Sequence, residues 1–169
     1  MSITYRDAVP ADAPLIARLY RTVFRDAFAH LYRPDNLDKF LSGVSLTDWE
    51  AQLADPAYAF RIAEADGTPA GYVKLGPLKL PVSSEGAAML LEQLYVLKPH
   101  HGRGIGRVLM DWAVDAARMR GAKQLYLTVF TDNRRAKRLY ELFGFEPAGR
   151  YDFRVGDQVD EDIIMLKQL

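Results

Sequence analysis

The stretch 92–107 constrains the fold more than any other part of this chain. A β-strand, over about residues 87–97, is followed by a short turn and then directly by an amphipathic helix. Every second residue of the turn is glycine: Gly102, Gly104 and Gly106. The first N–H groups of a helix have no internal partners, and the helix dipole adds partial positive charge there. Because glycines let a ligand approach the bare backbone, this unit predicts a phosphate or pyrophosphate site at the start of the helix.

Two common phosphate-binding loops do not fit these glycines. A Walker loop needs Gly, four residues and then Gly-Lys-Ser or Gly-Lys-Thr, and the chain has no such run. A Rossmann loop needs Gly-x-Gly-x-x-Gly, but the spacing from Gly102 and Gly104 reaches Arg107 instead of a glycine. Arg103 and Arg107 add cationic charge beside the turn. A glycine-rich turn without a ligand is the remaining alternative, and three alternating glycines would then carry an uncompensated entropic cost.

A second block leads from this pattern to a known family. Residues 133–145 read Asn-Arg-Arg-Ala-Lys-Arg-Leu-Tyr-Glu-Leu-Phe-Gly-Phe. Together with the Val96-x-x-Pro99 strand end and the glycine turn, this block resembles the motifs of the GCN5-related N-acetyltransferases (the GNAT superfamily). The resemblance implies acetyl-CoA as cosubstrate. It also implies a mixed α/β sandwich of order βααβββαβαββ, in which the central pair of strands splays apart.

The hydrophobic pattern agrees with that order of elements. Alternation and turn signals predict strands over residues 3–6, 58–65, 70–78, 87–97, 125–130, 145–155 and 159–167. Helices are predicted from Asp12 to the residues before Pro34, over 48–53, from the glycine turn to Gly121, and over 134–143. Thr47 and Glu50 form the capping box that is expected to open the second helix. No domain boundary is visible, so residues 1–169 are expected to form one N-acetyltransferase domain, with monomer and homodimer both left open.

The resemblance implies three groups of residues that hold the coenzyme. In the family, the strand before the glycine turn pairs with pantetheine through free backbone groups, and one of its N–H groups stabilises the oxyanion of the transition state. The turn binds the pyrophosphate. The second block contributes to the coenzyme site the amide side chain of Asn133 and the phenol of Tyr140. Carried over to this chain, the coenzyme-binding residues are Leu94, Tyr95, Val96, His101, Gly102, Arg103, Gly104, Ile105, Gly106, Arg107, Asn133 and Tyr140. His101 departs from the Arg or Gln that the family prefers, which a site built mainly from backbone N–H groups should tolerate.

Glu92 and Tyr140 are the expected catalytic residues. An alkylammonium has no lone pair for attack, so Glu92, a carboxylate in an apolar strand, is interpreted as the general base that takes its proton directly or through water. The alternative role of Glu92 is a salt bridge to a nearby arginine. In the family, the tyrosine that matches Tyr140 approaches the coenzyme sulfur and protonates the leaving thiolate, and its alternative role is that of a core aromatic. Asn133 is expected to cap its helix, to contact pantetheine, or to do both.

The composition of the chain limits the classes of partner and of chemistry that we expect. The 22 Lys and Arg residues balance 22 Asp and Glu residues, which argues against a nucleic-acid binder. The chain has no cysteine and therefore no thiol nucleophile, so acyl transfer is expected to be direct or to use another nucleophile. No apolar run suits a signal peptide or a membrane span, so we expect a cytoplasmic protein without a membrane partner. The pair His100 and His101 lacks a third ligand, and no metal is expected.

The acceptor of the acyl group is a small amine on this interpretation. Residues 70–75, 91–96 and 149–165 look like the bacterial spermidine/spermine N-acetyltransferases of the PaiA type, which implies a polyamine acceptor. Several ammonium groups would need facing carboxylates, and the candidates are Glu85, Glu92, Asp157, Asp160, Glu161 and Asp162. Another small amine, a peptide N-terminus and a non-catalytic acyl-CoA-binding sensor remain alternatives.

Overall fold

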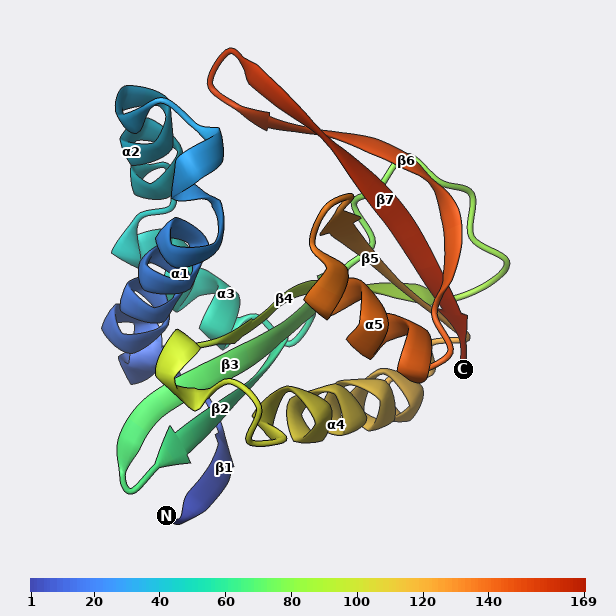
Figure 1. Cartoon of the computed structure of the whole chain (residues 1–169). Coiled ribbons are helices and arrows are strands. Elements are labelled where there is room, and N and C mark those ends of the chain that lie inside the picture. The colour runs from blue at the N-terminus through green and yellow to red at the C-terminus, as the bar shows by residue number, and fades with distance from the viewer.

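The computed structural model describes all 169 residues and contains one seven-stranded sheet (Figure 1). Across the sheet the strands follow in the order β1-β2-β3-β4-β5-β7-β6. In chain order they are β1 (Ile3–Asp7), β2 (Ala59–Ala65), β3 (Thr68–Pro77), β4 (Ala88–Val96), β5 (Gln124–Phe130), β6 (Glu146–Val155) and β7 (Gln158–Gln168). Neighbouring strands are antiparallel except β4 and β5, which run parallel at the centre of the sheet.

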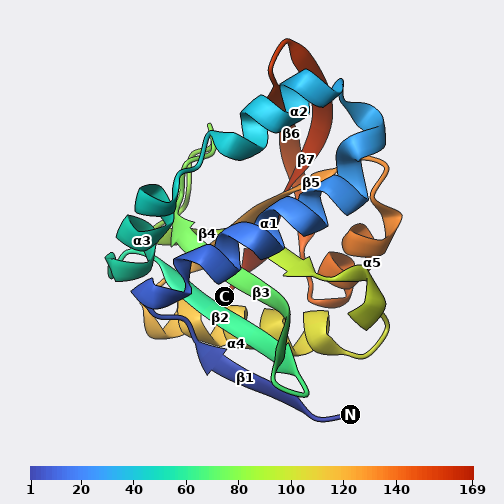
Figure 2. The same cartoon turned by 90° about the vertical axis from the view of Figure 1, so that its left-hand side faces the viewer.

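Helices cover both faces of this sheet (Figures 1 and 2). They are α1 (Ala13–Phe28), α2 (Pro34–Ser42), α3 (Leu46–Ala54), α4 (Ile105–Met119) and α5 (Arg134–Leu142). α1 and α3 pack on one face through a core that includes Trp49 and Tyr72, whereas α4 packs on the other face through a core that includes Leu109 and Leu125. α4 buries a stripe with helical spacing: Ile105, Leu109, Met110, Ala113, Val114 and Ala117. None of the helices has the length and apolar character that a membrane crossing requires.

The centre of the sheet is only partly paired. Residues 88–90 of β4 lie opposite residues 124–126 of β5, and beyond them the two strands separate. Residues 91–96 therefore have a strand partner on the β3 side alone. On that side the register shifts between Lys74 and Leu75, which leaves Glu92 as the extra residue of a β-bulge. The predicted splay of the central strand pair is confirmed, and the bulge lies where the splay begins.

α2 was not predicted from the sequence. α1 ends at Phe28, earlier than the predicted end before Pro34. Pro34 lies instead in the first turn of α2, where a residue without an N–H group is tolerated. α2 spans nine residues and buries Leu37 and Leu41. Leu37, Phe40 and Leu41 have the i, i+3, i+4 spacing of a helix, but this single short repeat was not recognised in the sequence.

The cap of α3 also differs from the prediction. The Ser45 hydroxyl oxygen accepts a hydrogen bond from the Asp48 N–H at 3.1 Å, and the Asp48 carboxylate accepts one from the Ser45 N–H at 2.8 Å. These reciprocal bonds form the capping box, two residues ahead of the predicted pair Thr47 and Glu50. Both pairs have the same spacing and the same donor and acceptor types, so the pattern alone did not separate them.

The β6–β7 hairpin extends toward α2, as Figure 1 shows. Asn36 Nδ2 donates a hydrogen bond to Asp157 Oδ1 at 2.7 Å, and the Arg33 N–H donates one to Gln158 Oε1 at 2.7 Å. These bonds tie the hairpin to Arg33, which immediately precedes α2, and to the first turn of α2. The Tyr32 hydroxyl, four residues after the end of α1, donates a hydrogen bond to Asp160 and so connects this segment to β7.

Candidate active site

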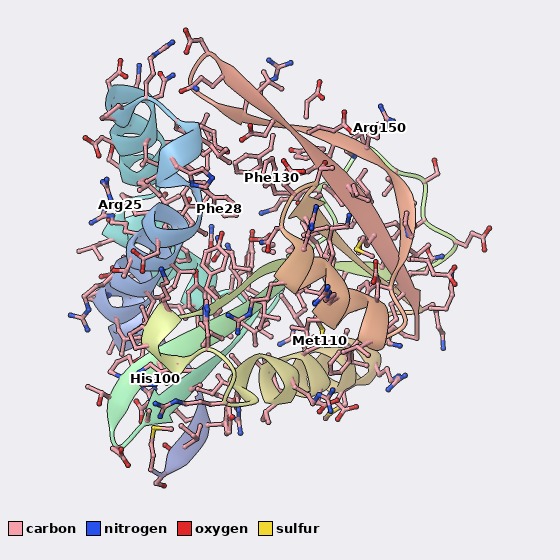
Figure 3. The ribbon with its side chains drawn as sticks, viewed as in Figure 1. Arg25, Phe28, His100, Met110, Phe130 and Arg150 are labelled. Carbon is pink, nitrogen blue, oxygen red and sulfur yellow. The ribbon has the colours of Figure 1, made fainter.

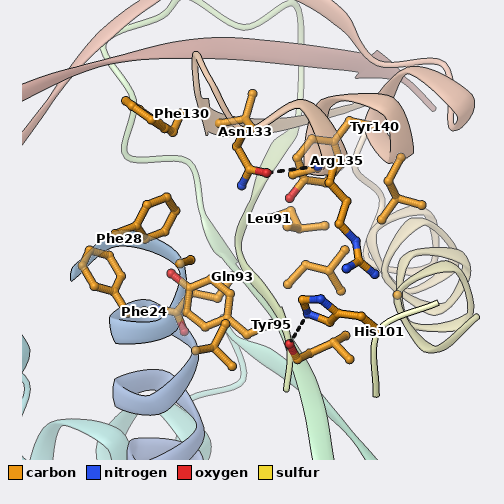
Figure 4. Close-up of a pocket in the computed structure, with 18 of the residues that line it drawn as sticks. Phe24, Phe28, Leu91, Gln93, Tyr95, His101, Phe130, Asn133, Arg135 and Tyr140 are labelled. Atoms are coloured by element: carbon orange, nitrogen blue, oxygen red, sulfur yellow. Dashed lines mark hydrogen bonds between the residues drawn. The ribbon is translucent and has the colours of Figure 1, made fainter. Parts of the chain in front are cut away.

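The separation of β4 from β5 opens a cavity of about 430 Å³ (Figure 4). Its lining comes from α1, β4, the glycine turn, β5, α5 and β7, and so from elements on both faces of the sheet. In Figure 4, Phe28 and Phe130 lie on one side of β4, and His101 and Arg135 lie on the other. The cavity therefore joins the two faces through the gap in the sheet.

The glycine turn places the N-terminus of α4 at this cavity. Gly102 and Gly104 have φ angles of 77° and 80°, in the left-handed region that residues with a Cβ rarely adopt. A Cβ on Gly106 would lie 3.5 Å from the Leu139 side chain of α5, which is ordinary van der Waals contact. The Val108 N–H donates to the Gly104 carbonyl, and no side chain caps the helix. The N–H groups of residues 105–107 are consequently left without protein partners at the helix end.

The open part of β4 carries the residues predicted to meet pantetheine. Leu94, Tyr95 and Val96 line the cavity, and β5 does not pair with this part of the strand. The Val96 carbonyl accepts a hydrogen bond from the His101 ring, with Nε2 and O 2.8 Å apart (Figure 4). His101, where the chain departs from the family pattern, thus ties the glycine turn to the end of β4.

Two arginines line the cavity, and one predicted arginine does not. Arg107 of α4 was predicted, and it contributes to the lining. Arg135 of α5 also lines the cavity and points toward the side of His101 (Figure 4), although the sequence did not single it out. It lies in a run of basic residues within 134–138, and only the rotation of the helix decides which of these side chains faces the cavity. Arg103 is not part of the lining, and its guanidinium contacts the Met1 sulfur.

Tyr140 and Asn133 reach the cavity from the second sequence block. Tyr140 is buried and packs against Phe145 with the ring centroids 6.0 Å apart. Burial raises the pKa of its phenol to about 12, so the hydroxyl keeps its proton at neutral pH. Asn133 Oδ1 accepts a hydrogen bond from the Ala136 N–H at 3.2 Å, which makes Asn133 the cap of α5. Both side chains also line the cavity.

Glu92 lies in the bulge, with its carboxylate between two lysines. Its Oε2 is 2.5 Å from Lys74 Nζ, and its Oε1 is 3.2 Å from Lys79 Nζ. Lys74 is 4% exposed and lies over the Trp49 ring, 5.2 Å from its centroid. Burial lowers the pKa of Lys74, and the neighbouring Glu92 charge acts in the opposite direction. The ion pair considered as an alternative for Glu92 is present, and lysines form it where the sequence suggested an arginine.

Aromatic rings line the part of the cavity on the α1 side. Phe24 and Phe28 of α1 have ring centroids 5.0 Å apart, and Phe28 meets Phe130 of β5 edge to face at 6.2 Å (Figure 3). Phe153 of β6 lies 6.2 Å from Phe24. In the sequence, Phe24 and Phe28 belong to the apolar stripe of the first helix, and nothing distinguishes rings that face a cavity from rings that fill a core.

One carboxylate lies among these rings. Asp162 of β7 lines the cavity and is 7% exposed. Burial raises the pKa of this carboxyl group to about 7, with a further contribution from the charge of Asp160, whereas a hydrogen bond from the Thr128 hydroxyl lowers it. No ion pair includes Asp162. It is therefore a buried acidic group that faces the cavity without a cation of the protein.

The other candidate carboxylates are placed differently. Asp160 accepts a hydrogen bond from the Tyr32 hydroxyl and lies next to the cavity without lining it. Asp157 is exposed at the hairpin tip and bonds to Arg33 and Asn36. Glu85 and Glu161 are exposed and do not line the cavity. Of the six carboxylates proposed from sequence, the structure brings Glu92 and Asp162 to the cavity.

The chemistry of this site points to one class of ligand. Free N–H groups at a helix start suit a pyrophosphate, and an unpaired strand edge suits a chain of amides that can add to it like a further strand. Coenzyme A contains both parts, so the fold and the cavity define a transferase that uses an acyl-CoA. The sequence profile of the Acetyltransferase (GNAT) family matches residues 18–145, and the chain belongs to this family. It is an acetyl-CoA-dependent N-acetyltransferase, with acetyl-CoA as cosubstrate.

Individual relatives agree with this assignment. An uncharacterized N-acetyltransferase of Mycobacterium tuberculosis is 29% identical over 159 residues, which cover 94% of this chain and 98% of the relative. The PaiA N-acetyltransferase of Thermoplasma acidophilum, solved with coenzyme A, is similar over 100% of both chains with a TM-score of 0.81 and 20% identity. YncA of Salmonella typhimurium, solved with acetyl-CoA, has a TM-score of 0.72 and 24% identity over 100% of this chain and 95% of that chain. The predicted fold class is confirmed.

Gly104→Val is expected to weaken acetyl-CoA binding. A β-branched residue at a φ of 80° is strained, so the turn should change conformation and carry the N–H groups at the start of α4 away from the pyrophosphate. We expect the dissociation constant measured by calorimetry to rise about tenfold or more, which corresponds to about 1.4 kcal/mol.

Gly121→Val is the matched control. Gly121 has a φ of 82° and open space around its Cβ position, as Gly104 has, but it follows the C-terminal end of α4 and does not line the cavity. The two variants should lose similar thermal stability, while only Gly104→Val loses affinity. Equal affinities in two folded variants would contradict the assignment of the turn.

Proposed function

We propose that residues 1–169 form one N-acetyltransferase domain that transfers acetyl directly from acetyl-CoA to a primary amine. The observation that carries this proposal is one cavity that reaches both faces of the sheet through the gap between β4 and β5. Coenzyme and amine then approach each other from opposite faces and are bound together. The chain has no cysteine, so no acyl-cysteine intervenes. Holding two reactants side by side removes much of the entropic barrier to their reaction.

The coenzyme is assigned to the side of α4 and α5. The turn 101–107 and the free N–H groups of residues 105–107 receive the pyrophosphate, and Arg107 and Arg135 supply cations nearby. Residues 94–96 offer their unpaired strand edge to pantetheine, and the Asn133 side chain lies at the same wall. This arrangement directs the thioester toward the gap in the sheet.

Tyr140 is proposed as the acid that assists departure of the thiolate. As the amine nitrogen forms its bond to the acetyl carbon and the C–S bond breaks, the phenol donates its proton to the sulfur. The buried hydroxyl with its raised pKa is protonated at neutral pH and therefore available as a donor. Its position at the cavity wall, in the last turn of α5, supports this role over that of a core aromatic alone.

Tyr140→Phe should lower kcat by about 10²-fold, because one proton donor to the leaving group is removed. The affinity for acetyl-CoA, measured by calorimetry, should change little. Tyr126→Phe is the control, because Tyr126 is a buried tyrosine of β5 that does not line the cavity. Wild-type turnover in Tyr140→Phe would return this residue to a packing role.

Glu92 stays a predicted base with a competing role. It lies on the face of the sheet that carries α1 and α3 and contributes to the cavity lining, as a base for the acceptor should. Its carboxylate is shared by Lys74 and Lys79, so an incoming ammonium would have to compete with two cations or lose its proton through water. The same ion pair holds the bulge from which the splay begins, which is a sufficient structural reason for a carboxylate at this position.

We propose a small cationic amine, and specifically a polyamine, as the acceptor. The resemblance of the sequence to the PaiA type motivates the proposal, and the α1 side of the cavity supports it. Phe24, Phe28 and Phe130 present aromatic rings, whose faces attract ammonium groups, and Asp162 supplies negative charge among them. A neutral or acidic acceptor would leave that buried carboxyl group without a cationic partner.

An amine panel with acetyl-CoA turnover as readout tests this function. Spermidine and spermine should have a higher kcat/KM than a neutral-tailed monoamine of equal length, and the acceptor KM should rise with ionic strength, since salt screens ion pairs that solvent can reach. Equal, salt-insensitive rates would remove the polyamine and leave another small amine or a peptide N-terminus as acceptor. Tight acetyl-CoA binding with no turnover on any amine would instead favour a non-catalytic sensor.

The remaining expectations from composition stay predictions. They are a cytoplasmic location, the lack of nucleic-acid and membrane partners, and a monomer or homodimer as the assembly state. Sedimentation of the purified chain distinguishes the two assembly states.

A further inference from the structure

Asp162 is a buried carboxyl group that the sheet holds in place but does not neutralise. It lies in β7 between two other strands, opposite Phe130 of β5 and Tyr151 of β6. It is 7% exposed and lines the cavity, and no lysine, arginine or histidine pairs with it. Burial of a charged carboxylate without a cation is costly, so the position calls for a ligand of opposite charge.

The groups around Asp162 are acidic or neutral on every side. Asp160 lies two residues earlier in β7, and the Tyr32 hydroxyl donates a hydrogen bond to it. Tyr151 of β6 is the register partner, and Thr128 of β5 donates its hydroxyl hydrogen to Asp162. No protein cation is positioned to hold this carboxylate. An ammonium that enters the cavity would be its first cationic partner.

Asp162 and the predicted acid, Tyr140, both lie near Tyr95 of β4. The pKa of Tyr95 is raised first by burial and then by neighbours that include both Tyr140 and Asp162. Tyr95, Tyr140 and Asp162 all line the cavity, and β5 no longer pairs with β4 at Tyr95. An amine at Asp162 is thus on the acceptor side, with the thioester site and Tyr140 beyond the gap.

We propose that Asp162 binds the ammonium group of the acceptor and accepts its proton. This inference rests on the proposed N-acetyltransferase function and names a group for its acceptor site. The carboxylate and R–NH3⁺ first form an ion pair, and one N–H proton then passes to a carboxylate oxygen. The freed lone pair of R–NH2 attacks the acetyl carbon, and the tetrahedral intermediate expels the thiolate of coenzyme A, which takes a proton from Tyr140. The second proton on the attacking nitrogen leaves to solvent as the amide forms.

Comparison with Glu92 favours Asp162 as the carboxylate that binds the acceptor ammonium. Both carboxylates lie on the acceptor face and line the cavity, but Glu92 already contacts two ammonium groups of the protein. Asp162 contacts none. An acceptor cation therefore gains a full ion pair at Asp162, whereas at Glu92 it would have to displace a lysine.

The proposal predicts that the kcat/KM for the amine depends on pH through the ionisation of Asp162. Asp162 must be ionised to bind the ammonium, and its pKa of about 7 places that ionisation near neutral pH. The kcat/KM for the amine should therefore rise as the pH increases through about 7, because this parameter reports the free enzyme. The alkylammonium itself, with a pKa of about 10.4, stays charged in this range.

The test is the pH profile of kcat/KM in three variants. Asp162→Asn should lower kcat/KM by about 10²-fold and remove the acid limb, with acetyl-CoA affinity unchanged. Asp160→Asn should keep the limb and shift it to lower pH, because it removes a negative neighbour that raises the pKa of Asp162. Glu92→Gln should keep the limb in place.

Folding is checked independently of turnover. A carboxyl group whose pKa is raised in the folded state penalises folding once the pH exceeds its unfolded value of about 3.9, and that penalty is fully present above the folded pKa. Asp162→Asn should therefore melt at or above the wild-type temperature at pH 8. If Asp162→Asn nevertheless failed to fold, the shift of the limb in Asp160→Asn would decide the question.

Each outcome separates this inference from the proposed function. Wild-type turnover on amines with an unaltered profile in Asp162→Asn, or an unmoved limb in Asp160→Asn, overturns the role of Asp162 alone. Loss of the limb in Glu92→Gln but not in Asp162→Asn assigns the base to Glu92. Absence of wild-type turnover with every amine overturns the acceptor assignment and this inference together.

Discussion

The incomplete pairing of β4 with β5 is the constraint on which the site depends. Backbone N–H and C=O groups need partners, and a central strand that loses its neighbour after three residue pairs leaves such groups facing a cavity. The bulge at Glu92 and the ion pair that holds it lie at the point of separation. The gap joins the two faces of the sheet, each of which carries its own helices, so the cavity can be reached from both faces.

Charge is separated across that gap although the chain as a whole is neutral. On the side of α4 and α5, a helix N-terminus, Arg107 and Arg135 favour the anionic coenzyme. On the side of α1, aromatic rings and the buried Asp162 favour a cation. Balanced composition excludes a general polyanion binder but says nothing of this arrangement, which arises only when β5, β7 and α1 are placed around one cavity.

The sequence predicted those parts of the site that depend only on residues close together in the chain. The strand, the glycine turn and the start of α4 follow from glycine spacing and helical period, and the cap at Asn133 follows from its helix. Arg135 and the rings of α1 were not singled out for the cavity, and Asp162 was only one of six candidate carboxylates. The positions of these residues depend on helix phase and on strand neighbours distant in the chain. α2 was missed although Leu37, Phe40 and Leu41 have helical spacing, because a nine-residue segment holds only this one short repeat.

Direct transfer through one cavity is tested most directly by initial rates, with acetyl-CoA and the amine varied together. If both substrates must be bound before the acetyl group moves, the double-reciprocal lines intersect, and no acetylated protein accumulates when acetyl-CoA is added alone. Parallel lines, together with an isolated acetyl-enzyme, would show a covalent relay and would contradict the account.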